Sequence, residues 1–216
     1  MKNILIITAH LDDMEIGMGG TVAKLKQQGH KIRLLTFCKG NRPWQEHVAV
    51  SRQIAAKKNC DILSIDDFIR LDYSDVLLDT VPFADIRSHI DSEIRSYKPE
   101  VIYSHYQYDI HRDHRIVYEA VRVTTRPRYN SSIKELLCFS IPGSTEWGKS
   151  LEEFTTFNDI TSVHDIKLQC IKNYETELRE SPDPISVDMI THRDSYIGSL
   201  CGYDKAECFK PIFTIS

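Results

Sequence analysis

The sequence predicts an α/β fold with a mostly parallel central sheet, and the arrangement of its apolar residues supports this class. Short apolar runs alternate with amphipathic stretches of helical length along the first half of the chain. Such alternation is typical of right-handed βαβ units, whose strands run parallel. The 216 residues contain no repeat, low-complexity tract or linker-like stretch, so we expect a single domain over residues 1–216.

Each expected element rests on the period of its apolar residues. In the first half, strands are predicted at Asn3–Thr8, Lys31–Phe37, Phe68–Leu71 and Val101–Ser104, and helices at Gly19–Gly29, Trp44–Asn59 and Pro82–Tyr97. Pro82 suits the first turn of a helix, and Pro99 follows the end of the same helix. In the second half, helices are predicted at 112–126, Val163–Arg179 and Ser186–Leu200, and strands at Glu135–Ser140 and Cys208–Ile215.

Composition excludes several classes of partner. Hydrophobic residues make up 41% of the chain and charged residues 27%, as in an ordinary globular protein. The net charge of −4 gives no reason to expect nucleic acid or an anionic membrane as partner. No signal peptide and no membrane-spanning apolar run is recognisable, so we expect a cytoplasmic protein. The six scattered cysteines form no C-x-x-C pair and indicate reduced thiols.

Polar side chains follow several strands of the predicted sheet at the point where each strand ends. His10, Asp12 and Asp13 follow the first strand, Asp72 follows the third, and His105 follows the fourth. In open α/β sheets, ligands bind outside the carboxyl ends of the strands. We therefore expect these groups to gather at one edge of the sheet.

A second polar cluster lies in "SHYQYDIHRDHRIVYEAV", residues 104–121. His111 and His114 are three residues apart at the start of a helical pattern, so their side chains can share one face. A carboxylate between such histidines can hydrogen-bond one ring and fix its tautomer. The two clusters together offer two histidines and a carboxylate, which suits a three-ligand catalytic zinc site with water in the open position.

Simpler interpretations exist for each group alone. An isolated histidine after a strand is usually solvated, and paired aspartates before glycine usually form a turn or a helix N-cap. The run Gly17-Met18-Gly19-Gly20 also suggests a nucleotide cradle. However, it is not the G-x-G-x-x-G of dinucleotide folds, and acidic residues stand where pyrophosphate would bind. Glycines that let the first helix approach the sheet closely are the simpler explanation. Two His/Asp clusters at one sheet edge favour the metal site.

These residues carry a family resemblance. Ala9-His10-Leu11-Asp12-Asp13 with the glycine run resembles the A-H-P-D-D-E-x-x-G-x-G-G signature of the LmbE-like, or PIG-L, family of zinc-dependent N-deacetylases. His111-Arg112-Asp113-His114 resembles that family's second motif, H-x-D-H, and "STEW" at 144–147 and "KAECF" at 205–209 resemble pieces of its bacterial sugar deacetylases. Leu11 replaces the usual proline, and Met14 takes the usual glutamate position, with Glu15 one place later.

The resemblance implies a Rossmann-like three-layer fold and one Zn²⁺ per chain, held by His10, Asp13 and His114. Asp12 would be the general base, and Asp113 would orient His111 as a histidinium that stabilises the developing oxyanion. The implied reaction removes an acetyl group from the amide nitrogen of an N-acetylglucosamine-type sugar or sugar conjugate.

Specificity for a small acetylated aminosugar would come from hydrogen bonds to sugar hydroxyls, and Asp72 and Arg52 are the candidates for substrate binding. Arg52 is equally well explained as a solvated helix arginine. Three alternatives stay open: an amidase for a larger acyl-aminosugar conjugate, a nucleotide-binding oxidoreductase, and a non-catalytic sugar-binding protein. The identity of the aminosugar is left open, and so is a homo-oligomeric state.

Overall fold

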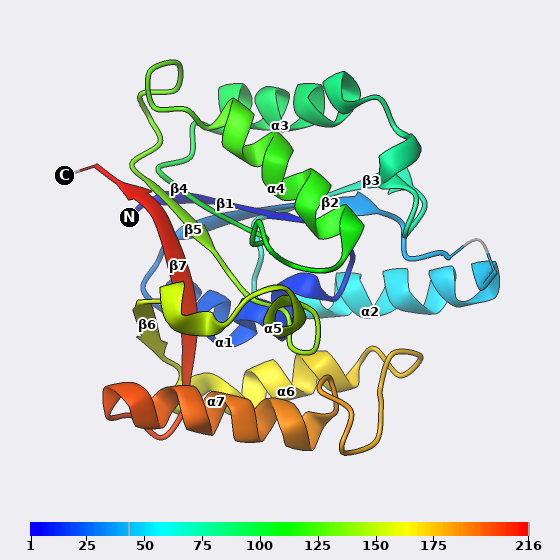
Figure 1. The fold of residues 1–216 in the computed structure, drawn as a ribbon, viewed down its shortest axis with the longest axis vertical. Coiled ribbons are helices and arrows are strands. Elements are labelled where there is room, and N and C mark those ends of the chain that lie inside the picture. The colour runs from blue at the N-terminus through cyan, green and yellow to red at the C-terminus, as the bar shows by residue number, and fades with distance from the viewer. Residues whose placement is uncertain (43, 216) are drawn as a thin grey trace.

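The computed structural model describes residues 1–42 and 44–215, which form one sheet covered by helices on both faces (Figure 1). Seven strands lie within these residues, in the order β3-β2-β1-β4-β5-β7-β6. Their bounds are Asn3–Thr8 (β1), Lys31–Cys38 (β2), Asp67–Tyr73 (β3), Val101–Ser104 (β4), Glu135–Cys138 (β5), Thr156–Asp159 (β6) and Ala206–Thr214 (β7). Strands β1 to β5 run parallel, whereas β7 is antiparallel to β5 and to β6. The mostly parallel sheet predicted from the sequence is confirmed.

Strand β1 is the centre of the sheet because its side chains are apolar on both faces. It pairs with β2 on one side and with β4 on the other. Ile4 and Ile6 belong to the apolar core below the sheet, and Leu5 and Ile7 to the core above it. A strand covered on both faces gives this continuous apolar run rather than an alternation.

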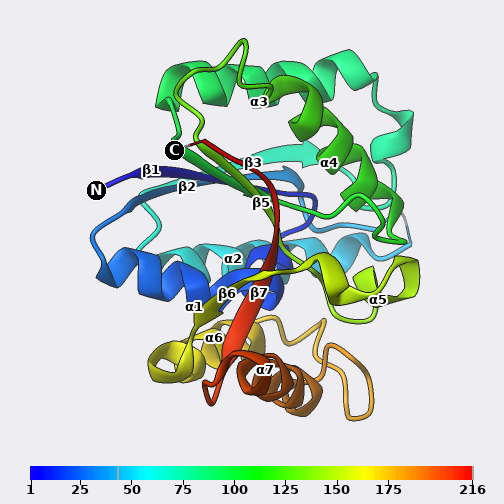
Figure 2. The same cartoon turned by 60° about the vertical axis from the view of Figure 1, so that its left-hand side comes forward.

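Helices form the two outer layers (Figure 2). On one face lie α3 (Phe83–Tyr97) and α4 (Arg112–Thr124), and on the other lie α1 (Asp13–Gln27) and α2 (Ala49–Ile62). Helices α6 (His164–Lys172) and α7 (Val187–Cys201) lie beyond α1 and α2, at the bottom of both views. The single turn α5 (Thr145–Gly148) follows β5. Within the described ranges, the helices are too short or too polar for one of them to cross a membrane.

The glycine run lies inside helix α1, which begins six residues earlier than expected. A Cβ at Gly17 would lie 2.6 Å from the Phe139 ring, and one at Gly20 would lie 2.8 Å from Ile160. Met18 between them has non-helical dihedral angles (φ −154°, ψ 21°), so the helix is kinked there. The glycines thus permit close packing of α1. This packing, with all four residues buried, leaves no exposed loop to cradle a phosphate.

One predicted helix ends earlier than expected, and one strand was not predicted. The helix expected at Val163–Arg179 ends at Lys172, and the following residues form turns that carry Tyr174 and Glu177. Strand β6 is absent from the sequence prediction because it is short, lies at the sheet edge and has only half-buried side chains.

The strand order places a crevice between the ends of β1 and β4. After β1 the chain enters α1 on one face of the sheet, and after β4 it enters α4 on the other face (Figures 1 and 2). Neighbouring strands whose connections leave in opposite directions create the switch point at which such sheets bind ligands.

Candidate active site

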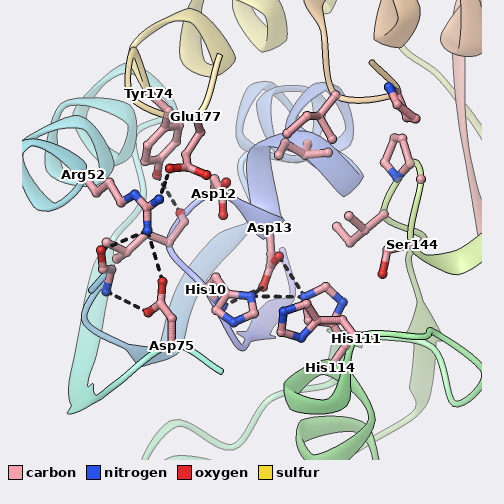
Figure 3. Close-up of a pocket in the computed structure, with 18 of the residues that line it drawn as sticks. His10, Asp12, Asp13, Arg52, Asp75, His111, His114, Ser144, Tyr174 and Glu177 are labelled. Carbon is pink, nitrogen blue, oxygen red and sulfur yellow. Dashed lines mark hydrogen bonds and ion pairs between the residues drawn. The ribbon is translucent and has the colours of Figure 1, made fainter. Parts of the chain in front are cut away.

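A cavity of about 330 Å³ opens at this switch point (Figure 3). Its lining comes from the segments after β1, β2, β3 and β4, from the turn after β5, and from the turns between α6 and α7. Of the predicted site residues, the lining includes His10, Asp12, Asp13, Arg52, His111 and His114. The structure therefore gathers six of them from distant parts of the sequence.

Three candidate ligands, His10, Asp13 and His114, form a triangle to which Asp13 contributes both of its carboxylate oxygens. His10 Nδ1 lies 3.2 Å from His114 Nε2 and 3.5 Å from Asp13 Oδ2, and Asp13 Oδ1 lies 3.3 Å from His114 Nε2. Tetrahedral zinc with ligand bonds of about 2.0–2.1 Å requires donor atoms roughly 3.3 Å apart. Donor atoms also gather within 4.8 Å of one another in three overlapping groups: His10 with His111 and His114, Asp13 with His105 and His114, and His10 with Cys38 and Asp113. The donor set and its spacing fit a divalent metal.

A carboxylate supports the far nitrogen of each histidine in the triangle. Asp113 Oδ2 lies 3.1 Å from His10 Nε2, and Asp109 Oδ2 lies 3.2 Å from His114 Nδ1. Both carboxylates are almost fully buried. A carboxylate on the outer nitrogen of a ligand histidine fixes its tautomer and leaves the inner nitrogen free to bind metal. The sequence analysis gave Asp109 no role.

Asp113 therefore has a different partner from the one predicted. Its Oδ2 accepts the backbone N–H of Val76 (2.7 Å) and pairs with His10, and its Oδ1 accepts the N–H of Leu78 (3.2 Å). His111 is the N-cap residue of α4, and its backbone is extended. Since Asp113 lies in the first turn of the helix, its side chain reaches the loop after β3 and not the neighbouring imidazole.

His111 lines the pocket beside His10 and His114. Burial and the adjacent His10 and His114 lower the pKa of His111 to about 3, opposite to the direction expected for a histidinium. Its ring packs edge-on against His10, with centroids 4.7 Å apart, and stacks on His114 at 4.5 Å. Its Nδ1 is buried and has no hydrogen-bond partner in the described structure.

His105 stacks behind the triangle, a role that the sequence analysis did not assign. Its ring is parallel to that of His114, with centroids 4.0 Å apart. Its Nε2 accepts the N–H of Ala9 (2.9 Å) and lies 3.1 Å from Asp13 Oδ2. Burial and the neighbouring His114 lower the pKa of His105 to about 4. A neutral, buried ring in this place fixes the positions of both ligands.

The two adjacent aspartates differ in environment. Burial alone would raise the pKa of Asp13, but the imidazoles of His114, His105 and His10 bring it well below its usual range. Burial and the neighbouring Asp13 raise the pKa of Asp12 instead. Asp12 precedes α1, yet its side chain makes no capping hydrogen bond and lines the pocket. Asp12 is thus a carboxylate free to act on a ligand.

Arg52 reaches the pocket, but both ends of its guanidinium are held. Nη1 donates to Gly40 O (3.0 Å) and Asp75 Oδ2 (3.2 Å), and Nη2 donates to Glu177. Arg42 donates to the other oxygen of Glu177 at 3.1 Å. Arg52 is therefore buried and links Gly40, Asp75 and Glu177 in one wall of the pocket, in contrast to the solvated arginine of the simpler interpretation.

Asp72 is not brought into the pocket. Its side chain is 80% exposed and pairs with Arg70 at 2.7 Å. Strand β3 continues to Tyr73, so Asp72 still belongs to the strand and points outward, and Asp75 in the following loop takes the expected place. Glu177 was also missed, because it lies on a turn inside a segment predicted to be helical.

Comparison with known proteins gives one family and several structural neighbours. Residues 5–125 match the PIG-L family, whose description is GlcNAc-PI de-N-acetylase. A diacetylchitobiose deacetylase from Thermococcus kodakarensis is 26% identical over 226 residues, which cover 96% of this chain and 82% of the relative.

Two solved structures share the fold over nearly the whole chain. The N,N'-diacetylchitobiose deacetylase of Pyrococcus horikoshii, in complex with its inhibitor MPG, has a TM-score of 0.77 at 19% identity, covering 98% of this chain and 84% of that one. The 4-carboxy-2-hydroxymuconate hydratase GalB of Pseudomonas putida KT2440 has a TM-score of 0.76 at 20% identity, covering 100% and 98%. At these identities the similarity establishes the fold and leaves the reaction to the site.

Proposed function

The chain belongs to the PIG-L family, and on that premise we propose that it is a zinc-dependent N-deacetylase. The proposed reaction hydrolyses the acetamide of an N-acetylglucosamine-type sugar or sugar conjugate to acetate and a free amine. The observation that carries the proposal is the triangle of His10, Asp13 and His114 donor atoms, with the uncommitted carboxylate of Asp12 on the same pocket wall.

His10, Asp13 and His114 would hold one Zn²⁺ per chain. When bound, the ion supplies Lewis acidity to the amide carbonyl and makes water easier to deprotonate. Asp113 hydrogen-bonds the outer nitrogen of His10, Asp109 lies 3.2 Å from the outer nitrogen of His114, and His105 stacks on His114. The remaining chemistry is proton transfer and charge stabilisation by side chains of the chain itself.

Asp12 is the proposed general base. Its carboxylate takes a proton from the attacking water and returns it to the amine nitrogen, which leaves only when protonated. A base that serves both steps needs a pKa above that of an ordinary aspartate, and burial beside Asp13 shifts the pKa of Asp12 upward. The absence of a capping bond leaves both of its oxygens available to substrate.

His111 is proposed to donate one N–H to the carbonyl oxygen as negative charge develops there. A neutral imidazole has one donor nitrogen, and a preorganised donor in a partly buried pocket stabilises an oxyanion strongly. The lowered pKa of His111 supports this neutral donor in place of the histidinium expected from the sequence. Asp113 acts instead by orienting His10.

A single aminosugar suits the volume and lining of the cavity. About 330 Å³ lies at the small end of ligand pockets. Asp75, Glu177 and the Arg52 side chain that joins them offer hydrogen bonds to sugar hydroxyls along one wall. The names of the diacetylchitobiose deacetylases among the relatives support a substrate of this class.

A second candidate function is the hydration of an enol acid. The hydratase GalB, named for 4-carboxy-2-hydroxymuconate, shares the fold over nearly the whole of both chains. The two candidate reactions give different products, so product analysis distinguishes them. Zinc-loaded protein is incubated with N-acetylglucosamine and N,N'-diacetylchitobiose, and acetate and primary amine are quantified. Equal amounts of both products, lost with chelator and restored by zinc, support the deacetylase. No acetate from either sugar, together with hydration of 4-carboxy-2-hydroxymuconate in a parallel incubation, would establish the hydratase instead.

A further inference from the structure

A second hollow of about 260 Å³ lies beside the candidate active-site cavity. Pro142, Gly143 and Pro184 belong to the linings of both, so a ligand that extends past these three residues would reach from one hollow to the other. Beyond these shared residues the hollow is lined by Glu146, Trp147, Met189 and Arg193, and we call these four residues and the three shared ones the Trp147 shelf. None of the proposed chemistry uses the shelf.

Trp147 is a large aromatic side chain left in solvent. It is 80% exposed, although it lies beside a cavity rather than on an open helix face. Burying an exposed indole against a ligand gains both apolar contact and the directional interactions of its π face. The exposed Trp147 beside this hollow therefore indicates a place where a ligand binds against the indole ring.

The turn that carries Trp147 is fixed to the candidate metal site. Asp109, whose Oδ2 lies 3.2 Å from His114 Nδ1, accepts hydrogen bonds from Ser144 and from Thr145 Oγ1 (2.9 Å). A Cβ on Gly148 would lie 1.4 Å from Tyr108 O, so the end of the turn is packed directly on that backbone. The shelf is thus held at a constant distance from the reacting centre.

The rim of the shelf is polar. Glu146 Oε1 accepts from Arg193 Nε at 3.1 Å, and Glu146 Oε2 accepts from the N–H of Gly143 at 2.9 Å. An alkyl chain that covered the Glu146–Arg193 pair would remove water from both groups and offer no hydrogen bonds in its place. A sugar ring has an apolar face for the indole and hydroxyls for the carboxylate and guanidinium, so it matches both parts of the shelf.

We propose that the Trp147 shelf binds a second sugar ring, linked to the aminosugar in the active-site cavity. The inference rests on the proposed function and narrows it: the preferred substrate is a glycoside of at least two rings. Trp147 stacks on the second ring, and Glu146 and Arg193 hydrogen-bond its hydroxyls. Trp147 then determines which acetylated sugars are good substrates without taking part in the chemistry.

The test compares zinc-loaded wild type, Trp147→Ala and Trp147→Phe on N-acetylglucosamine, N,N'-diacetylchitobiose and an octyl glycoside of N-acetylglucosamine. Trp147→Ala should lower kcat/KM for the disaccharide about tenfold, which equals about 1.4 kcal/mol, and leave the monosaccharide within about twofold. Trp147→Phe should retain most of the disaccharide activity. Trp44→Ala is the control, because Trp44 is 68% exposed and does not line either cavity. Equal losses on all three substrates, no loss, or a loss confined to the octyl glycoside would overturn the proposal.

Binding without turnover separates this proposal from the proposed function. The chain has two tryptophans, so Trp44→Phe leaves Trp147 as the sole indole reporter. Its fluorescence should change saturably with the disaccharide and not with the monosaccharide, even if neither sugar is deacetylated. No change with the disaccharide contradicts the shelf, and no acetate from any sugar contradicts the proposed function.

Discussion

Asp113 Oδ2 lies 3.1 Å from His10 Nε2, across a separation of 103 residues in the sequence. This pair joins the two sequence motifs: one motif supplies the candidate ligand and the other supplies the carboxylate that orients it. Asp109 lies beside the outer nitrogen of His114 in the same way, although these two residues are only five apart in the sequence. Two oriented imidazoles and Asp13 then present their donor atoms to one point.

Loss of the Asp113 carboxylate should weaken metal binding. Asp113→Asn leaves His10 Nε2 without its carboxylate, and removal of such a partner typically costs about 10–100-fold in metal affinity. Competition with a fluorescent zinc chelator measures this change. Asp72→Asn is the control, since the exposed Asp72 pairs only with Arg70 in the described structure. Unchanged zinc affinity in Asp113→Asn, with kcat reduced, would return Asp113 to the catalytic role first predicted from the sequence.

Removal of the proposed base should separate binding from catalysis. Asp12→Asn keeps the size of the side chain but cannot accept the proton of water, so kcat should fall about 10²–10⁴-fold. The zinc content should stay that of the wild type, because Asp12 is not one of the triangle donors. Acetate release and elemental analysis on the same preparation check both expectations. Loss of zinc in Asp12→Asn and its retention in Asp13→Asn would mean that the two aspartates have exchanged roles.

Replacement of His111 should affect kcat without removing the metal. His111→Ala deletes the proposed N–H donor to the oxyanion, and loss of one such donor typically costs about 10²–10³-fold in kcat. His111→Gln keeps an N–H donor of similar reach and should retain more activity than the alanine variant. Steady-state kinetics of both variants at saturating zinc make the comparison. Equal activity of His111→Ala and wild type would exclude the donor role.

Glu15 should make the protein less stable as pH rises. Burial raises the pKa of Glu15 to about 8, from an ordinary value near 4.5. The folded state then binds the Glu15 proton more tightly than the unfolded state, so the contribution of Glu15 to stability is fully present below pH 4.5 and is lost as the pH rises to about 8. The side chain of Glu15→Gln is neutral at every pH, so the variant does not lose this stability. The melting temperature of the variant minus that of wild type should therefore increase from pH 4.5 to about pH 8 and stay constant above it. Melts at pH 5 to 9 check this, with the exposed Glu46→Gln as control; a constant difference would contradict it.

The sequence was sufficient for the elements whose burial is uniform. Strands β1 and β4 have the predicted bounds because their apolar side chains are buried on both faces. The order of βα units also predicted that His10 and His114 would meet at one edge. Such inferences depend on local periodicity and on the general topology of parallel sheets.

The partners of individual carboxylates could not be read from the sequence. Asp113 pairs with His10 and not with His111 because backbone N–H groups of the loop after β3 hold its carboxylate in place. The path of that loop cannot be predicted from the periodicity of the sequence. The pairing of Glu177 with Arg52 likewise depends on the early end of α6 at Lys172. Asp75 lies in the pocket in place of Asp72 because β3 ends two residues later than expected, at Tyr73. In each case, long-range packing determines which of several similar carboxylates reaches the pocket or a given partner.

Metal content per chain tests the central claim most directly. Elemental analysis is made on protein purified without chelator, in wild type and in the His10→Ala/His114→Ala double variant. The proposed centre predicts one zinc per wild-type chain and a content near zero in the double variant, with His30→Ala, which lies outside the cavity, equal to wild type. A double variant that is folded and still retains one zinc per chain would contradict the claim that His10, Asp13 and His114 hold the metal.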